Sequence, residues 1–208
     1  MKRVLFQGDS ITDMMRSREN DKFLGIGYPV LVSAELGLDY PGEYEFLNRG
    51  VSGNRIVDLY ARIKSDIINL KPDVISFLIG INDVWHELDE RYNGVDAEKY
   101  YTIYSMLISE VKAALPDTKI MILEPFVLKG SGTEEDWEYF STETLKRAVK
   151  AKKLAEKFNL KFVPLQSKFD EAERLADSSY WLWDGVHPNY PGHEIIKREW
   201  IKAFKEIV

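Results

Sequence analysis

The chain has 208 residues, enough for one domain of ordinary size with a single buried core. Hydrophobic residues make up 45% and charged residues 30%, a balance typical of globular proteins rather than disordered or fibrous ones. The formal net charge is −6 and no basic cluster stands out, which argues against nucleic acid or an anionic membrane surface as a partner. The absence of cysteine excludes disulfides, thiolate metal sites and a cysteine nucleophile.

The apolar run near the N-terminus is short. Val4-Leu5-Phe6 is followed at once by Gln7-Gly8-Asp9, so the run is too short for the core of a signal peptide. No stretch approaches the roughly 18 apolar residues of a membrane span. Since there is also no repeat or linker-like composition, we expect a single cytoplasmic domain over residues 1–208 with no membrane partner. Assembly into a homo-oligomer is left open.

Short apolar runs alternate with longer segments of helical period along the chain. The predicted strands are Val4–Gln7, Tyr44–Asn48, Asp73–Gly80, Lys119–Glu124 and Lys161–Pro164. The predicted helices are Tyr28–Leu38, Ile56–Leu70, Ala97–Leu115, Glu143–Phe158, Ser167–Ala176 and Pro191–Ile207. This alternation implies right-handed crossovers, so we expect an α/β fold: a flavodoxin-like three-layer α/β/α sandwich with a five-stranded parallel sheet.

Four polar segments lie where such a sheet binds its ligand, beyond the carboxyl ends of the strands. The first three follow the first three predicted strands: Gly8-Asp9-Ser10-Ile11-Thr12, Gly50-Val51-Ser52-Gly53-Asn54 and Gly80-Ile81-Asn82-Asp83. The fourth, Asp184-Gly185-Val186-His187-Pro188, precedes the last helix. We therefore expect these segments to meet at one edge of the sheet.

These segments contain the groups that acyl transfer needs: a nucleophile, a base, a group that orients the base, and donors for the oxyanion. Ser10 falls in a strand-to-helix turn, where backbone amides point toward the predicted crevice. His187 follows Asp184 by three residues, a spacing that lets the carboxylate select the imidazole tautomer. Gly53 can offer a backbone N–H and Asn82 a side-chain amide, which together with the Ser10 amide make three oxyanion donors.

Together the four segments resemble those of the SGNH (GDSL-like) hydrolase superfamily, whose name refers to its Ser, Gly, Asn and His. The match runs from residue 8 to residue 193 in family order, and its one departure is Ile11, where the signature has leucine. The resemblance implies a serine esterase without cofactor or metal. It implies the following roles: Ser10 as nucleophile, Gly53 and Asn82 as oxyanion donors, His187 as base and Asp184 as its partner.

Within this superfamily the chain resembles the acetylxylan esterase branch, whose members remove acetyl groups from xylan or xylo-oligosaccharides. The similar segments are Gly8–Asp13, Leu24–Pro29, Gly80–Trp85 and Trp183–Pro188. Tryptophans adjoin the predicted catalytic segments, and indole faces offer large apolar surfaces on which sugar rings can lie. We expect an acetyl ester, either a small molecule or an oligosaccharide, as substrate, with contacts from Asp9, Asn54, Trp85 and Trp183.

Other functions on the same scaffold stay open at this point: a different short-chain acyl esterase, a thioesterase or a lysophospholipase. A lipid-acting enzyme would need an exposed apolar lid, whereas the insertion at residues 125–140 is mixed and acidic. A non-catalytic flavodoxin-like binding module would have no use for a serine, histidine and aspartate set. We predict structural roles for His193 and Glu124, and for His86 either a structural role or a contact with substrate or a neighbouring subunit.

Overall fold

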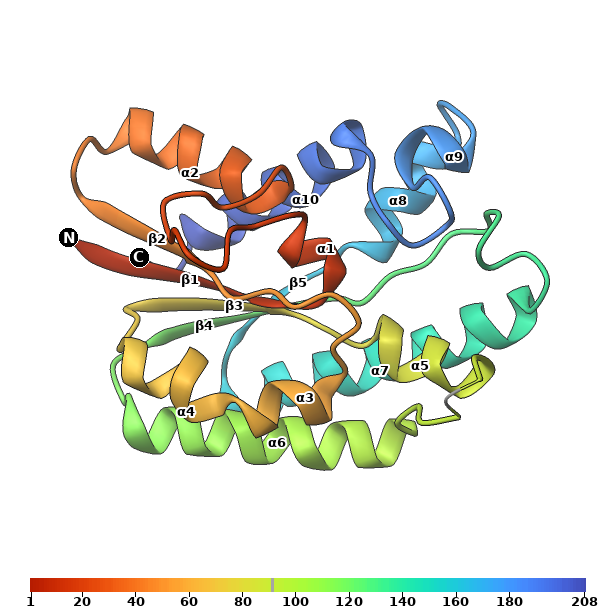
Figure 1. Ribbon diagram of the computed structural model, residues 1–208, viewed down its shortest axis with the longest axis horizontal. Coiled ribbons are helices and arrows are strands. Elements are labelled where there is room, and N and C mark those ends of the chain that lie inside the picture. The colour runs from red at the N-terminus through yellow and green to blue at the C-terminus, as the bar shows by residue number, and fades with distance from the viewer. Residues whose placement is uncertain (91) are drawn as a thin grey trace.

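A computed structural model describes residues 1–90 and 92–208, and its centre is one sheet of five parallel strands (Figure 1). The strands are β1 Lys2–Gly8, β2 Tyr44–Asn48, β3 Val74–Leu78, β4 Lys119–Leu123 and β5 Lys161–Val163. Their spatial order is β2-β1-β3-β4-β5, and every neighbouring pair is parallel. The predicted α/β fold with a five-stranded parallel sheet is confirmed.

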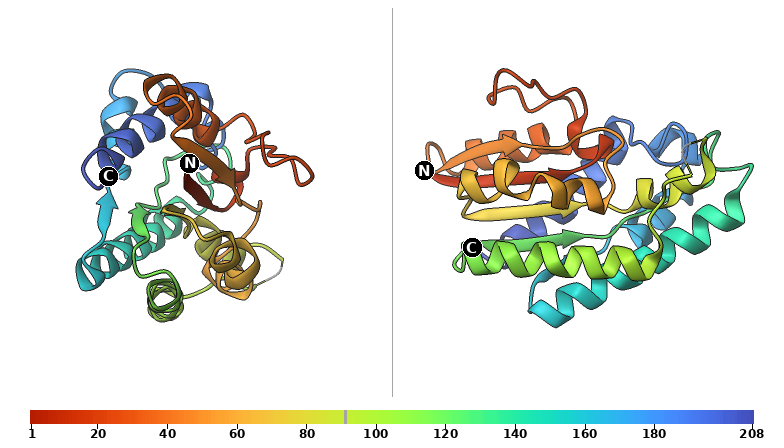
Figure 2. Two further views of the ribbon diagram at one scale, coloured as in Figure 1. Left: turned by 90° about the vertical axis from the view of Figure 1, so that its left-hand side faces the viewer. Right: turned by 60° about the horizontal axis from the view of Figure 1, so that its bottom comes forward.

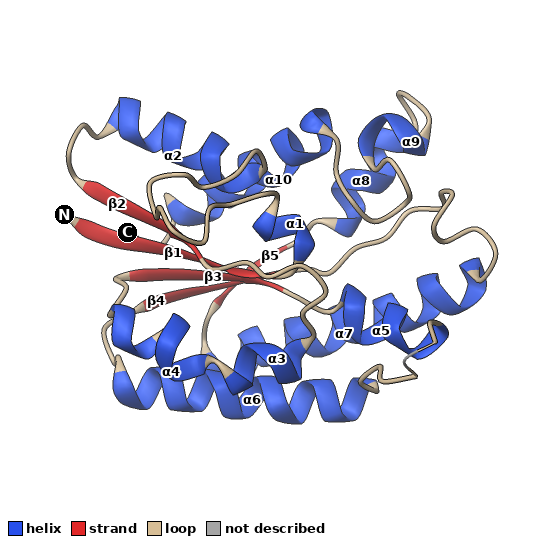
Figure 3. Cartoon of the chain, in the orientation of Figure 1, coloured by secondary structure: helices blue, strands red, loops and turns tan. Residues whose placement is uncertain are grey.

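Helices cover both faces of the sheet, as the view along the strands shows (Figure 2, left). One layer contains α2 Tyr28–Asp39, α8 Gln166–Glu173, α9 Ser178–Trp181 and α10 Tyr190–Phe204. The other contains α3 Ile56–Ala61, α4 Ile63–Asp66, α6 Ala97–Ala114 and α7 Trp137–Phe158. The red strands lie between these blue layers in Figure 3. Among residues 1–90 and 92–208, no helix is long and apolar enough to cross a membrane.

Each central strand supplies side chains to two separate apolar cores, because neighbouring residues of a strand point to opposite faces. In β1, Val4 and Phe6 join the core under α2 and α10, whereas Leu5 joins the core over α6. In β3, Ile75 and Phe77 belong to the α6 core. Burial on both faces explains why these strands appear in the sequence as unbroken apolar runs rather than alternating ones.

Three local predictions were wrong. The helix predicted over Ile56–Leu70 is divided into α3, α4 and the 3₁₀ turn Ile68–Leu70, with breaks at Arg62 and Ile67. The apolar period predicts the buried face correctly, but it carries no information about where the backbone turns within that face. The α7 helix begins at Trp137 rather than Glu143, so part of the insertion at residues 125–140 is helical. The short helices α1 Ser10–Asp13, α5 Ile81–Leu88 and α9 are additional.

Asn48 ties together two loops at the carboxyl edge of the sheet. It is the last residue of β2 and only 3% exposed. Its Nδ2 donates to the carbonyl oxygens of Thr12 (2.6 Å) and Leu24 (2.8 Å), while its Oδ1 accepts from the N–H of Gly50 (2.9 Å). One side chain thus satisfies three buried backbone groups of the β1–α2 and β2–α3 connections.

Asn48→Ala is expected to lower the free energy of unfolding by about 2–4 kcal/mol, because it leaves three backbone groups without their partner. Urea denaturation followed by circular dichroism measures the change. Asn20→Ala, at an exposed position of the β1–α2 connection, is the control and should stay within about 0.5 kcal/mol of the wild type. Equal losses for the two variants would contradict this role of Asn48.

Candidate active site

Ser10 lies in a tight strand-to-helix turn at the end of β1. Asp9 is the N-cap of α1, and its Oδ1 accepts from the N–H of Ile11 (3.0 Å). Gly8 is required by close packing, since a Cβ there would lie 2.4 Å from a carbonyl oxygen of β3. Asp9 capping and the absence of a side chain at Gly8 therefore fix the path of the turn, and the Ser10 side chain is left half-buried at the carboxyl edge of the sheet.

A hydrogen-bonded relay joins Ser10, His187 and Asp184. The Ser10 Oγ lies 2.8 Å from His187 Nε2, and His187 Nδ1 lies 2.7 Å from Asp184 Oδ2. An ionised carboxylate can only accept, so we assign the ring proton to Nδ1, which donates it to Asp184 and leaves Nε2 free to accept the serine proton. The fold thus brings together the three residues that the sequence predicts as the relay. The arrangement can activate a serine oxygen for attack on a carbonyl carbon.

The Asp184 carboxylate is held in its ionised form by its own turn. Partial burial opposes ionisation, but the His187 side chain and the backbone N–H groups of His187 (2.8 Å) and Val186 (2.9 Å) outweigh it. The pKa of Asp184 therefore lies below its usual value. A charged carboxylate at this position can stabilise the imidazolium that forms when His187 takes up a proton.

The two further oxyanion candidates, Gly53 and Asn82, come from loops that are locked to each other. Gly53 has φ +80°, in the left-handed region that favours glycine. The Nδ2 of Asn82 donates to the carbonyl oxygen of Asn54 (3.1 Å), and one of its two amide hydrogens is thereby used. Both carboxylate oxygens of the next residue, Asp83, lie within 3.2 Å of the N–H of Ile56 at the start of α3. The start of α5 and the β2–α3 loop are therefore held as one unit.

One predicted substrate contact needs correction. Asp9 is 1% exposed and its Oδ1 accepts from the N–H of Ile11, so its contacts in the structure support the Ser10 turn. The physical reason is that a carboxylate directly before a helix is best placed to cap it. Asn54 is half-buried, and its Oδ1 accepts from the Nε of Arg62 (2.9 Å). This contact gives Asn54 a part in shaping the loop that carries Gly53.

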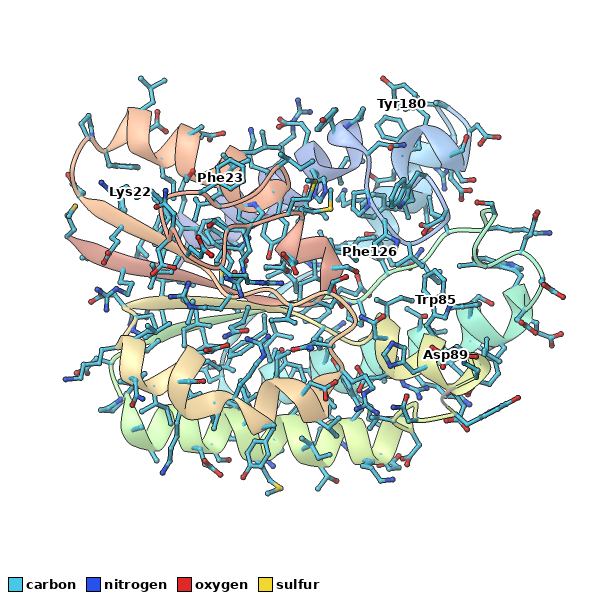
Figure 4. The ribbon with its side chains drawn as sticks, viewed as in Figure 1. Lys22, Phe23, Trp85, Asp89, Phe126 and Tyr180 are labelled. Carbon is cyan, nitrogen blue, oxygen red and sulfur yellow. The ribbon has the colours of Figure 1, made fainter. Side chains whose placement is uncertain are left out.

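Two tryptophans lie close to the imidazole of His187. The Trp85 ring lies 6.0 Å from the imidazole, centroid to centroid, and meets the ring of Phe140 edge-on. Figure 4 shows Trp85 projecting from α5 at the carboxyl end of the sheet. The Trp183 ring lies 5.6 Å from the imidazole at 88°, and it is 62% exposed. This places a large exposed aromatic surface beside the Ser10–His187 relay.

The other polar candidates have structural contacts. His193 is fully buried, its Nδ1 accepts from the N–H of Tyr28 (3.2 Å), and burial lowers its pKa to about 4. Glu124 Oε2 accepts from two N–H groups at the start of α8, those of Leu165 and Gln166. His86 is 6% exposed. Within residues 1–90 and 92–208, no three His, Asp or Glu side chains gather closely enough to hold a metal ion.

Residues 6–195 match the GDSL-like Lipase/Acylhydrolase family. The chain belongs to this family. It is 35% identical to an acetylxylan esterase of Geobacillus stearothermophilus, over 96% of this chain and 92% of that protein. The crystal structure of Axe2, an acetylxylan esterase of the same organism, superposes with a TM-score of 0.87 at 33% identity, covering 97% of this chain and 93% of that chain.

A further structural relative is a GDSL-like protein of Parabacteroides merdae, with a TM-score of 0.91 and 39% identity over 98% of this chain and 95% of that one. Family and relatives together confirm the resemblance seen in the sequence and identify the chain as a carboxylic ester hydrolase. The sequence motifs do not point to Asn48. The only signal for Asn48 is an amide side chain at the end of a predicted strand.

The difference in free energy of unfolding between Asp9→Asn and the wild type is expected to change in favour of the variant as pH rises from about 5 to about 8. An aspartate in the unfolded chain titrates near 3.8, whereas burial raises the pKa of Asp9 to about 7 in the folded protein. Between these values the unfolded chain has lost a proton that the folded protein keeps, so this group makes stability fall as pH rises. Asparagine caps helices equally well and does not titrate.

Urea midpoints of both proteins at the two ends of this pH range test the expectation. Asp21→Asn is the control: the hydrogen bond with Arg49 lowers the pKa of Asp21, so its titration is complete below this range. Its difference from the wild type should therefore not change with pH here. A pH-independent difference for Asp9→Asn as well would show that Asp9 is already ionised in the folded protein.

Proposed function

We propose that the chain is a serine esterase for short acyl groups that releases acetate from acetylated xylan or xylo-oligosaccharides, with Ser10, His187 and Asp184 as its catalytic residues. The observation that carries the proposal is the unbroken relay from Ser10 Oγ through His187 to Asp184, with contacts of 2.8 and 2.7 Å. The similarity to an acetylxylan esterase supports the substrate. The relay itself is independent of the substrate.

In the proposed reaction, Ser10 Oγ attacks the ester carbonyl carbon while its proton passes to His187 Nε2. The negative charge that forms on the carbonyl oxygen is stabilised by the backbone N–H groups of Ser10 and Gly53 and by the side-chain amide of Asn82. The tetrahedral intermediate then collapses: the bond between the acyl carbon and the sugar oxygen breaks, and that oxygen takes the proton from His187. The acetyl group is left bound to Ser10 Oγ as an ester.

Water completes the cycle by the same path in reverse. His187 removes a proton from a water molecule, which attacks the acyl-Ser10 carbonyl and forms a second tetrahedral intermediate. Its collapse releases acetate and returns the proton to Ser10 Oγ. In both halves Asp184 accepts a hydrogen bond from His187 Nδ1 and stabilises the imidazolium, without taking up a proton itself.

The aromatic surroundings of His187 favour a small acyl group and a sugar leaving group. Trp85 is partly buried and wedged between the imidazole and Phe140, which leaves a bulky wall beside the relay. Trp183 is exposed and lies beside the same imidazole, so a pyranose ring could lie against its indole. A lipase or lysophospholipase would instead gain from a long apolar groove, in which each buried methylene adds about 0.8 kcal/mol.

Ser10→Ala is expected to reduce kcat with p-nitrophenyl acetate by at least about 10⁴-fold, because no other group can form the acyl intermediate. His187→Ala should be nearly as severe. Ser33→Ala, a half-buried serine of α2, should behave like the wild type. A fluorophosphonate probe should label the wild type but not Ser10→Ala, as seen by intact mass. Labelling or substantial turnover in Ser10→Ala would remove Ser10 from the mechanism.

The substrate proposal is tested by kcat/KM across p-nitrophenyl acetate, butyrate and octanoate. We expect a steep fall with chain length, because the wall at Trp85 excludes a longer acyl chain. Acetate release from acetylated xylo-oligosaccharides, followed by an enzyme-coupled acetate assay, should be rapid. A series that rises with chain length would overturn the acetyl-esterase proposal in favour of a lysophospholipase or thioesterase, while leaving the catalytic residues unchanged.

A further inference from the structure

The connection between β4 and α7 lies directly against the turn that carries Asp184. The N–H of Leu128 donates to the carbonyl oxygen of Gly185 (2.8 Å), and the N–H of Gly132 donates to the carbonyl oxygen of Asp184 (2.9 Å). We call residues 128–133 the bracket. In Figure 1 it belongs to the green trace that leaves β4 and passes close to the blue loop before α10.

Three glycines allow the two backbones to approach without side chains between them. Gly185 has φ +94°, and a Cβ there would lie 2.5 Å from the carbonyl oxygen of Leu128. A Cβ on Gly130 would lie 2.5 Å from the backbone nitrogen of Gly185. A Cβ on Gly132 would lie 3.1 Å from the carbonyl oxygen of Asp184. Any displacement of the bracket is therefore passed directly to the backbone of the Asp184 turn.

Thr133 fixes the shape of the bracket from inside. It is 1% exposed, so its hydroxyl is shielded from water. Its Oγ1 accepts from the N–H of Gly130 (2.9 Å) and donates to the carbonyl oxygen of Leu128 (2.8 Å). Thr133 Oγ1 also packs against Gly185, since a Cβ on Gly185 would lie only 2.6 Å from it. One hydroxyl thus holds together the two bracket positions that border Gly185.

The Asp184 carboxylate cannot orient its own turn. Both of its oxygens are engaged within the turn, by the backbone of Val186 and His187 and by the imidazole of His187. These bonds fix the carboxylate relative to the turn but not the turn relative to Ser10. The bracket supplies the connection to the sheet, because it begins five residues after the end of β4.

We propose that Thr133 is a positioning residue for the esterase reaction: it shapes the bracket, which holds the Asp184 turn so that His187 faces Ser10. This proposal rests on the proposed function. It also assigns a role to the first half of the 125–140 insertion, which acts as a fixed support rather than a lid. Because reaction rates are steeply sensitive to sub-ångström misplacement of catalytic groups, the expected signature is a loss of kcat.

Thr133→Val keeps the size and branching of the side chain but removes the hydroxyl. With p-nitrophenyl acetate we expect kcat to fall about 10-fold and KM to stay within about twofold, because the substrate surfaces are untouched. Thr133→Ser restores the hydroxyl and should recover kcat to within about twofold of the wild type. Wild-type kcat in Thr133→Val, or no recovery in Thr133→Ser, would overturn the proposal.

Thr144→Val is the matched control. Thr144 is an equally buried threonine of α7, 1% exposed, and its hydroxyl makes no hydrogen bond within residues 1–90 and 92–208. The same substitution at this position should leave both kcat and KM within about twofold of the wild type. A similar loss of kcat in both variants would mean that kcat responds to any buried threonine replacement, and the proposal would fail.

A double-mutant cycle shows whether Thr133 acts through Asp184. If it does, Thr133→Val should cause little further loss of kcat in the Asp184→Asn background, because the group that it positions is already impaired. An undiminished 10-fold loss in that background would place the effect elsewhere and overturn the proposal. Gly132→Ala, which presses a methyl group on the Asp184 carbonyl, serves as a second variant if Thr133→Val does not fold. Gly132→Ala should lower kcat in the otherwise wild-type protein and cause little further loss in the Asp184→Asn background.

A spectroscopic readout separates this proposal from the proposed function. The proton on His187 Nδ1, hydrogen-bonded to Asp184, should give a downfield NMR signal that His187→Gln abolishes. Thr133→Val should shift or broaden this signal, whereas Thr144→Val should not. An unchanged signal in Thr133→Val would overturn the positioning role. A wild type with this signal but no activity on any ester would overturn the proposed function alone.

Discussion

The contact between Ser10 Oγ and His187 Nε2 joins residues that are 177 positions apart, and the rest of the site depends on it. Parallel strands make such a contact possible, because their carboxyl ends all lie at one edge of the sheet. The sheet brings the two loops close, but the exact distance between Ser10 Oγ and His187 Nε2 depends on the two turns that carry these residues. The Asp9 cap fixes the turn on the serine side, and hydrogen bonds to the Asp184 carboxylate fix the internal shape of the turn on the histidine side.

Two buried carboxyl groups, those of Asp9 and Asp83, hold the loops of the site in place, and their burial disfavours ionisation. Burial raises the pKa of both Asp9 and Asp83 to about 7, so each resists ionisation near neutral pH. Apolar replacements would avoid this penalty but could not accept the backbone N–H groups of Ile11 and Ile56. The fold therefore retains polar groups in a dry region where they define loop geometry, which is the use expected of a fully buried hydrogen-bonding side chain.

Sequence reasoning predicted the sheet well because its signal is local. The strand Tyr44–Asn48 has the predicted bounds, and the other strands agree to within a few residues. The proximity of Ser10, His187 and Asp184 was also predictable, since Asp184 and His187 belong to one short motif. The bracket was not, because its contacts with the Asp184 turn are made by backbone atoms of glycines, which leave no apolar period and no chemical motif. Asp9 was misplaced for a related reason: the same carboxylate can cap a helix or face a substrate, and only burial distinguishes the two.

The bracket also couples the acid–base relay to the substrate side of the site. A Cβ on Gly132 would lie 3.2 Å from Cη2 of Trp85 as well as 3.1 Å from the carbonyl oxygen of Asp184. Trp85 in turn lies against the imidazole of His187. The wall proposed to limit the acyl group and the Asp184 turn proposed to orient His187 thus share one support. A substitution that makes room for a longer acyl chain by moving Trp85 would also loosen the Asp184 turn, so broader acyl specificity in this chain should come with slower turnover.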